Sequence, residues 1–381
     1  MKTNVLIIGG GISGASIAYH LAKKGVKDIV VVDKSYFTSG DTGRCGAGVR
    51  QQWGTKTNCL LAKRSIDFFE KAKDILGYAN DLEFKQEGYL ILATTPKEAL
   101  QFKKNVALQQ ECGIPSRVVS KEEALQIVPH LNPDAFLSAT YCPTDGHLNP
   151  FKMSEAYMLA AKRLGVIFNF FEEVTAIHSH QSSVTHVVTN KTTYEVNQVV
   201  NAAGGYSREV GLLAGVDIPV YSEKHEILAT EPTSRMQGPM VMSFSKNIYC
   251  QQVPHGAFLM GRSDPYVEKN HDLESTHNFL DEMAKTAVHI LPALGRLRVV
   301  RQWAGHYNMS PDRQPILGGV DEKDNFYVAC GFSGHGFMFA PITGEIVADI
   351  MCHELPFMDV SELSIQRFKN KTTFHVEMSV V

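Results

Sequence analysis

The chain opens with two short apolar runs separated by an amphipathic stretch. Residues 5–8 form the first run, and residues 29–32 form the second, which ends in Asp33. Continuous apolar runs of this length are typical of strands buried on both faces of a sheet. Between the runs, small and apolar residues recur at helical spacing, at Ala15, Ala18, Leu21 and Ala22. The pattern predicts a strand, a helix and a second strand.

The turn between the first predicted strand and the helix reads Gly9-x-Gly11-x-x-Gly14. Gly9 permits a tight turn, Gly11 leaves room for a pyrophosphate, and Gly14 lets the helix pack closely on the strand. The helix N-terminus adds unpaired N–H groups and a partial positive charge. Asp33 is placed to accept a hydrogen bond from a ribose hydroxyl. We expect a dinucleotide here; a chance glycine turn is the alternative.

Later segments predict two further groups of strands. Residues 87–94 are expected to form a strand and residues 96–112 an amphipathic helix. The first group lies at 166–171, 174–177 and 199–203, and small residues follow the last of these strands, where a ligand can lie against the backbone. The second group predicts a separate, more antiparallel sheet and lies at 227–230, 248–252, 258–261 and 297–303.

The end of the chain repeats the strand–glycine–helix pattern. An apolar strand at 326–330 leads into the glycine-rich run 331–337, and a helix follows. A second helix N-terminus directed at one ligand suits a flavin, whose pyrimidine edge gains negative charge on reduction. A glycine-rich turn without a ligand is the alternative. Residues 39–49 hold four more glycines, which predicts a loop that is exposed or wrapped around a ligand.

Composition excludes several classes of function. The 381 residues include 37 basic and 40 acidic side chains, so a nucleic acid or an acidic membrane surface is not an expected partner. Seven cysteines without a C-x-x-C pair argue against iron–sulfur, zinc-ribbon and disulfide frameworks. No apolar run could span a bilayer, and the early first strand leaves no room for a signal peptide, so we expect a cytoplasmic protein. No metal site is expected, since His178, His180 and His186 suit a solvated turn.

Together these segments resemble the FAD-dependent D-amino-acid oxidase, glycine oxidase and sarcosine oxidase family over nearly the whole chain. The likeness is carried by the first glycine turn and by residues 199–204, 303–318 and 331–337. Residues 44–52 and 331–338 resemble in particular the beta subunits of heteromeric sarcosine oxidase and dye-linked L-proline dehydrogenase.

The resemblance implies an α/β fold with a Rossmann-like FAD-binding domain interleaved with an antiparallel-sheet substrate domain. The FAD-binding domain is expected at 1–80, 150–217 and 310–365, the substrate domain at 81–149 and 218–309, and a C-terminal tail at 366–381.

The resemblance also assigns residues to roles. The implied FAD contacts are Gly9, Gly11, Ile12, Ser13, Gly14, Asp33, Lys34, Thr42, Arg44, Cys45, Gly46, Val174, Ala203, Gly204, Gly305, Gly334, His335, Gly336, Phe337 and Met338. Tyr249 and Tyr307 are expected to line the substrate pocket. Arg50 is the first candidate to bind a substrate carboxylate and Arg262 the second, because a planar guanidinium suits bidentate carboxylate recognition. His335 is expected to be a structural or flavin-edge donor rather than a general base.

Three positions depart from the single-chain sarcosine oxidases. Met338 and Leu259 stand where those enzymes have lysines that pair with the substrate and assist reaction with oxygen, and Gly305 stands where they attach FAD through cysteine. We therefore expect non-covalent FAD and an electron acceptor other than oxygen. The implied partners are subunits of a heteromeric dehydrogenase, with an FMN shared between subunits as a further expectation.

The expected activity is oxidation of the C–N bond of a small amino acid by hydride transfer to the flavin, which gives an imine. Expected substrates are a secondary or N-methyl amino acid such as proline, hydroxyproline or sarcosine, or else glycine or a D-amino acid. Three alternatives remain: oxidation of a hydroxyl substrate such as glycerol 3-phosphate, an NAD-linked reductase, and a non-catalytic FAD-bearing electron-relay subunit.

Overall fold

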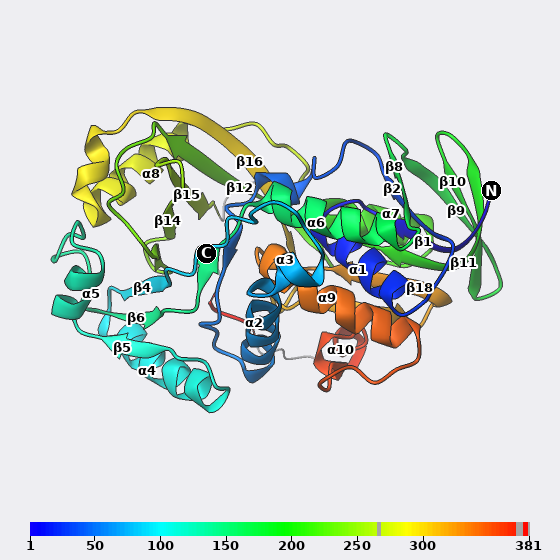
Figure 1. The fold of residues 1–381 in the computed structure, drawn as a ribbon, viewed down its shortest axis with the longest axis horizontal. Coiled ribbons are helices and arrows are strands. Elements are labelled where there is room, and N and C mark those ends of the chain that lie inside the picture. The colour runs from blue at the N-terminus through cyan, green and yellow to red at the C-terminus, as the bar shows by residue number, and fades with distance from the viewer. Residues whose placement is uncertain (265–267, 371–375, 380–381) are drawn as a thin grey trace.

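The computed structural model describes residues 1–264, 268–370 and 376–379. Figure 1 shows two lobes, each built on one large sheet. The helices packed with the first sheet are α1 (Ile12–Lys23), α2 (Lys56–Phe69), α3 (Ala72–Ile75), α6 (Pro150–Arg163), α7 (Ser207–Leu213), α9 (Gly336–Met351) and α10 (Arg367–Asn370). Those of the second lobe are α4 (Pro96–Glu111), α5 (Lys121–Ile127) and α8 (His277–Ile290).

The first sheet has the order β17-β18-β11-β1-β2-β8, and β10 and β9 extend it beside β11. Its strands are β1 (Lys2–Ile8), β2 (Ile29–Asp33), β8 (Ile167–Phe170), β9 (Val174–His180), β10 (Ser183–Thr189), β11 (Thr193–Asn201), β17 (Ile316–Val320) and β18 (Lys323–Cys330). The strands from β18 to β8 run parallel, whereas β17, β10 and β9 pair antiparallel. This is the Rossmann-like arrangement that the sequence predicted.

Both faces of the first sheet are covered, which explains its continuous apolar runs. Val5 and Ile7 belong to a core shared with α1, α6 and α9, whereas Leu6 and Ile8 face a second core with β9, β10 and α7. Successive side chains of a strand point to opposite faces, so a sheet buried on both sides needs apolar residues at every position. Gly344 of α9 faces α1, where an added Cβ would lie 2.2 Å from Ser16 Oγ.

The second sheet has the order β16-β12-β15-β14-β13-β4-β6-β5 and is antiparallel except where β13 joins β4. Its strands are β4 (Tyr89–Ala93), β5 (Arg117–Val119), β6 (Ser138–Cys142), β12 (Tyr221–Thr230), β13 (Met240–Ser243), β14 (Ile248–Gln252), β15 (Phe258–Ser263) and β16 (Val299–Met309). The expected separate sheet is therefore confirmed, and β16 runs further toward the first lobe than the sequence predicted. The mixed α/β fold class is confirmed as well.

Several short elements complete the chain. They are η1 (Asp41–Arg44), β3 (Gly48–Val49), β7 (Gly146–His147), η2 (Gly204–Tyr206), η3 (Pro292–Arg296) and η4 (Ser361–Leu363). The exact domain division remains a prediction, and the alternation of chain segments between the two sheets supports it. Of the predicted tail, residues 371–375 and 380–381 lie outside the described residues. No helix in the described part of the chain is long and apolar enough to cross a membrane.

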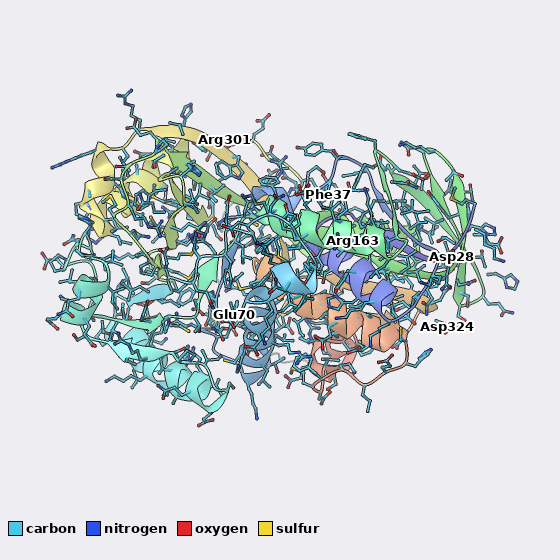
Figure 2. All side chains as sticks on the ribbon, viewed as in Figure 1. Asp28, Phe37, Glu70, Arg163, Arg301 and Asp324 are labelled. Atoms are coloured by element: carbon cyan, nitrogen blue, oxygen red, sulfur yellow. The ribbon has the colours of Figure 1, made fainter. Side chains whose placement is uncertain are left out.

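The orientation of the first sheet decides where a ligand can bind. Figure 2 shows Asp28, just before β2, and Asp324, at the start of β18, at the end of the molecule away from the second sheet. Arg301 of β16 lies in the other lobe. The carboxyl ends of the parallel strands therefore face the second sheet, which is the edge where open α/β sheets bind their ligands.

Candidate active site

A cavity of about 620 Å³ lies at the carboxyl ends of β1, β2 and β11, against the second sheet. Every residue that the sequence analysis assigned to FAD lines it except Gly14, and so do Arg50, Tyr249, Tyr307 and His335. This volume is within the range of small-molecule and cofactor sites. The structure thus brings the predicted site residues together from segments spread along most of the chain.

The first glycine turn has the geometry that the fingerprint predicts. Gly9 has a φ of 112°, and an added Cβ would lie 2.2 Å from the carbonyl oxygen of Ala202. Gly14 does not line the cavity. It packs against the end of β1, where an added Cβ would lie 2.0 Å from the carbonyl oxygen of Gly9. Gly11 precedes α1, so the first N–H groups of this helix face the cavity.

Asp33 is fixed by the backbone around it. Its Oδ2 accepts a hydrogen bond from the N–H of Gly10 at 2.7 Å, and its Oδ1 accepts one from the N–H of Ser35 at 2.9 Å. Burial raises the pKa of the Asp33 carboxyl above its ordinary value. Because each carboxylate oxygen has two lone pairs, both atoms can accept a further hydrogen bond from a ligand hydroxyl.

The second glycine turn brings the N-terminus of α9 to the same cavity. Gly334 has a φ of 91°, and an added Cβ would lie 2.4 Å from the ring of Tyr307, so only glycine fits there. His335, Gly336, Phe337 and Met338 follow and line the cavity. The first turn of α9 contains no acidic side chain, so its N–H groups and the helix dipole are free to meet an electron-rich ligand.

Burial, together with the nearby charge of Arg50, lowers the pKa of His335 to about 3. The imidazole is therefore neutral at physiological pH. Its Nε2 is buried and has no hydrogen-bond partner among the described residues. Its ring meets the indole of Trp53 edge to face, with the ring centroids 4.8 Å apart. A neutral, unpartnered ring nitrogen beside the start of α9 suits a hydrogen bond to a ligand better than proton transfer.

The glycine-rich loop at 39–49 is tied to the second sheet. Arg44 donates to the carbonyl oxygens of Ser39 (3.2 Å) and Ala304 (3.0 Å), and its own carbonyl oxygen accepts from the indole of Trp303 at 2.8 Å. Burial raises the pKa of the Cys45 thiol to about 12, and this thiol donates to the carbonyl oxygen of Thr42. Cys45 is therefore a protonated packing residue in the cavity wall, since only a thiolate is a strong nucleophile.

Aromatic rings from the second sheet form the opposite wall of the cavity. His225 of β12 lies parallel to Tyr307 of β16 at 4.1 Å between ring centroids, and the centroid of the Tyr249 ring of β14 is 5.6 Å from that of His225. The His225 imidazole shares hydrogen bonds with the Tyr249 hydroxyl (3.2 Å) and with Ser263 Oγ (3.1 Å). Burial lowers the pKa of His225 to about 3 and raises the pKa values of both tyrosines. The whole wall is therefore uncharged.

Sequence reasoning missed several lining residues, namely His225, Tyr89, Met240 and Met242. His225 carried no clear signal, because it lies in the polar half of β12 between Lys224 and Glu226. It pairs with Gly305 of β16. Tyr89 reaches the cavity at Gly48, where an added Cβ would lie 1.8 Å from its hydroxyl oxygen. Gly48 is therefore the position in the predicted loop where the absence of a side chain makes room for Tyr89.

Arg50 is a buried cation at the substrate end of the cavity. Arg50 is 3% exposed, and its guanidinium carbon Cζ lies 3.7 Å from the centroid of the Trp53 ring. Its guanidinium donates to the carbonyl oxygens of Gln52 (2.7 Å) and Ser379. Among the described residues, no carboxylate forms an ion pair with it. Glu377 and Asp145 favour the charged guanidinium through space without a contact ion pair. A buried charge without a direct partner is costly, so Arg50 is able to pair with an anion.

Two other candidates lie away from the cavity. Arg262 points toward α8, with Thr286 Oγ1 at 3.4 Å and Glu282 at 3.9 Å. Leu259 packs in a core with Ile227 and Tyr249 and does not line the cavity. The exposed histidines 178, 180 and 186 lie on the β9–β10 hairpin, and the described residues contain no cluster that could hold a metal ion.

The cavity fits FAD by its own features. Two helix N-termini face it, and its wall includes glycines such as Gly11 and Gly305 that leave the backbone bare. Three of the lining residues carry buried side-chain nitrogens without partners in the described residues, at His306 Nε2, Asn308 Nδ2 and His335 Nε2. Unpartnered buried donors are rare in folded proteins and mark places where a ligand completes the hydrogen bonding.

Comparisons with known proteins agree with this geometry. The family described as FAD dependent oxidoreductase matches residues 4–350. Mitochondrial dimethylglycine dehydrogenase of Rattus norvegicus is 28% identical over 98% of this chain and 45% of that protein, so the chain spans about half the length of this relative. Sarcosine oxidase subunit beta of an Arthrobacter species is 26% identical, over 96% of this chain and 91% of that subunit.

A solved structure extends the likeness to the fold. The crystal structure of L-proline dehydrogenase from P. horikoshii superposes with a TM-score of 0.92 and 36% sequence identity, over 97% of this chain and 98% of that one. The family match covers both glycine turns and both sheets, as the resemblance predicted. The chain therefore belongs to the DAO family of FAD-dependent oxidoreductases.

Proposed function

We propose that this protein is an FAD-dependent dehydrogenase that oxidises the C–N bond of a small amino acid. The observation that carries the proposal is Arg50, a buried guanidinium in the cavity wall without a carboxylate partner among the described residues. A guanidinium has five N–H donors, and Arg50 uses two of them in hydrogen bonds to main-chain oxygens. The remaining donors suit the carboxylate of an amino acid.

The walls around Arg50 give the substrate its orientation. Tyr249, Tyr307 and the neutral His225 form an uncharged aromatic wall, and Met240 and Met242 add apolar contacts. Such a lining excludes water and holds one face of a small substrate, so positioning contributes most of what the chain itself supplies. Because His225 and His335 are both neutral, neither competes with the substrate amine for a proton near pH 7.

The two glycine turns would hold the cofactor. Gly9 to Ser13 and Asp33 would bind its nucleotide half, and residues 334–338 its flavin half. FAD, when bound, accepts the two electrons and the hydrogen that leave the substrate carbon. The N-terminus of α9 would stabilise the negative charge of the reduced ring through its N–H groups and dipole.

A phosphate substrate fits the cavity less well. Of the described lining residues, only Arg44 and Arg50 are arginines, and Arg44 is already bonded to the carbonyl oxygens of Ser39 and Ala304. A glycerol 3-phosphate site would need several convergent cations. The proposal of a carboxylate substrate therefore rests on one guanidinium with unused N–H donors, rather than on a cluster of cations.

Similarity to known proteins supports the substrate class. The names of the relatives and of the solved structure refer to dimethylglycine, sarcosine and L-proline, which are secondary or tertiary amines with a carboxylate. We propose the same class here, with glycine and D-amino acids as wider candidates. A heteromeric assembly, an FMN shared with a partner and a cytoplasmic location remain predictions, and the first is favoured by the similarity to a sarcosine oxidase subunit.

Anaerobic bleaching of the flavin tests the proposal. The purified holoprotein should lose its flavin absorbance with at least one compound among proline, hydroxyproline, sarcosine, glycine and D-amino acids. Pyrrolidine, which lacks the carboxylate of proline, should react far more weakly than proline if proline is the substrate. Bleaching by glycerol 3-phosphate, or by none of the compounds, would contradict the proposed activity and favour the hydroxyl or electron-relay alternative.

A further inference from the structure

Residues 376–379 lie against the carboxylate-binding candidate Arg50. The carbonyl oxygen of Ser379 accepts a hydrogen bond from Arg50 Nη2. Glu377 is 1% exposed and Ser379 is also buried, although both are polar. A buried polar segment needs specific partners for its groups, so its contacts show what holds it in place.

The Glu377 carboxylate organises this segment. Its Oε2 accepts hydrogen bonds from Asn58 Nδ2 at 3.0 Å and from Thr55 Oγ1 at 3.2 Å. Its Oε1 accepts one from the main-chain N–H of Ser379 at 2.9 Å. One carboxylate thus joins the beginning of α2 to the residue whose carbonyl oxygen contacts Arg50.

The position of the carboxylate is favourable for its charge. Thr55 is the N-cap of α2, a helix of 14 residues without an acidic side chain in its first turn. A negative charge at a helix N-terminus is stabilised by the helix dipole and by unpaired N–H groups. The main-chain N–H of Glu377 is bonded to the carbonyl oxygen of Asp312, whose carboxylate forms a buried ion pair with Arg367 at 2.7 Å.

We propose that Glu377 is a positioning residue for substrate binding. By holding the Ser379 N–H it orients the Ser379 carbonyl oxygen, and this oxygen fixes one side of the Arg50 guanidinium so that the free N–H groups face the cavity. The inference rests on the proposed function, since it assigns Arg50 to a carboxylate ligand. Arg50 itself touches the substrate, whereas Glu377 does not: it acts through the segment, and its charge also favours the charged form of the Arg50 guanidinium.

The variant Glu377→Gln tests the inference. Glutamine keeps the shape of the side chain but has one acceptor oxygen in place of two, so it cannot accept all three hydrogen bonds. Glu362→Gln is the matched control, because Glu362 is an exposed carboxylate that accepts from Thr57 at the same end of α2 at 2.8 Å and does not contact Arg50.

Binding is measured separately from turnover. Cyclopentanecarboxylate has a carboxylate on a small ring and no amine to oxidise, and its methyl ester lacks the charge. Both are titrated into the parent, Glu377→Gln and Glu362→Gln holoproteins while the flavin absorption spectrum is recorded. The rate of anaerobic flavin reduction at saturating amino acid is measured in parallel.

We expect Glu377→Gln to bind the carboxylate about tenfold more weakly than the parent, the effect of weakening one charge-assisted hydrogen bond. Binding of the ester and the saturating reduction rate should stay within about twofold, since Arg50 positions the carboxylate rather than the reacting bond. Glu362→Gln should behave as the parent. If Glu377→Gln does not fold, Ser379→Pro, which removes the N–H bonded to Glu377, should give the same selective loss.

Three outcomes would overturn the inference. These are unchanged carboxylate binding in Glu377→Gln, an equal loss for the carboxylate and the ester, and a parent that does not bind the carboxylate. Failure of the proposed function gives a different result. A parent that binds the carboxylate and loses this binding in Glu377→Gln, yet is bleached by no amino acid, supports the positioning role and contradicts only the proposed activity.

Discussion

The imidazole of His225 lies parallel to the phenol ring of Tyr307, with 4.1 Å between the ring centroids and 6° between the ring planes. Stacking of this kind removes the imidazole from water, and burial lowers its pKa to about 3. The ring is therefore neutral across the physiological range. Its hydrogen bonds to Tyr249 and Ser263 make it a fixed part of the cavity wall rather than a titrating group.

A first prediction concerns the pH dependence of flavin reduction. Because the pKa values of His225 and His335 are both about 3, neither side chain changes its charge between pH 5 and pH 8. The anaerobic reduction rate should show the ionisation of the substrate amine and no histidine inflection. The measurement is a stopped-flow pH profile of the parent and of His225→Gln and His335→Gln. An inflection near pH 6 that disappears in either variant would disprove this assignment.

Asp33→Ala should weaken retention of FAD while leaving the chain folded. The change removes the acceptors for a ribose hydroxyl, a loss of roughly 1.5–3 kcal/mol for hydrogen bonds to a charged group. Flavin content after gel filtration measures the effect, with Asp28→Ala, a surface carboxylate at the other end of β2, as the control. Denaturation followed by filtration should release yellow flavin from the parent, because Gly305 offers no thiol for attachment. Equal retention in both variants would refute the role of Asp33.

Arg50→Lys should impair binding of the amino-acid substrate by about 10- to 100-fold, because a lysine cannot reproduce a bidentate guanidinium fork. Flavin content should not change. Arg262→Lys separates the two arginine candidates, since Arg262 lies toward α8 and away from the cavity. A loss of binding in Arg262→Lys alone would transfer the carboxylate role to that residue, and a loss of flavin in Arg50→Lys would make Arg50 a cofactor ligand.

Asp145 should make the stability of the protein depend on pH. Burial raises the pKa of its carboxyl to about 6, although Gln52 and the N–H of Gln51 donate to it. Between pH 4 and pH 6 the folded chain binds more protons here than the unfolded chain, so the free energy of unfolding falls as the pH rises. Once the carboxyl is charged in the folded chain, above its pKa of about 6, the free energy of unfolding has fallen by about 3 kcal/mol.

Denaturant unfolding of the holoprotein at several pH values checks this prediction. Asp145→Asn should remove the slope between pH 4 and pH 6, so that the difference from the parent changes across this range. Asp134→Asn replaces an exposed carboxylate and should retain the slope of the parent. If the free energy of unfolding changes with pH in the same way in the parent and in Asp145→Asn, the Asp145 carboxyl does not cause the pH dependence.

Reoxidation of the reduced flavin by oxygen should be slow. Met338 stands in the first turn of α9, and the lysine and arginine residues that line the cavity in the described chain are Lys34, Arg44 and Arg50. A cation beside the flavin stabilises developing superoxide, so an apolar residue there should slow reaction with oxygen. Stopped-flow reoxidation measures the rate, and Met338→Lys should raise it while Met338→Gln should not. Fast turnover with oxygen by the isolated parent chain would rule out a dedicated dehydrogenase.

The sequence predicted the first sheet, and the glycine turns that border the cavity, because their signals are local. Gly14 is required by a contact within its own turn, with the carbonyl oxygen of Gly9, and the apolar runs of β1 and β2 are continuous because both faces are buried. The same holds for Gly334, whose positive φ follows from the turn before α9. Each of these residues can be interpreted from its immediate neighbours in the chain.

The substrate side was harder to predict because its residues meet through strand register. His225 reaches the wall opposite Gly305 only when β12 pairs with β16. The resemblance placed Leu259 where single-chain sarcosine oxidases have a lysine that assists reaction with oxygen, but its side chain packs in a core instead. Strand side chains alternate between two faces, so a shift of one position reverses the result. Burial of Glu377 had no signal in the sequence, because its partners on α2 lie more than 300 residues away.

The pairing of β1 with β11, and of β11 with β18, has a consequence for biosynthesis. Leu6 lies beside Val199 and Val199 beside Phe326, so β1 and β11 acquire their full surroundings only after β18 has been made, about 300 residues after β1. Contacts so distant in sequence form slowly and leave apolar strands exposed in the meantime. We therefore expect nascent chains that stop before β18 to need chaperones or to aggregate, and capture of the dinucleotide to follow the synthesis of β18 and α9.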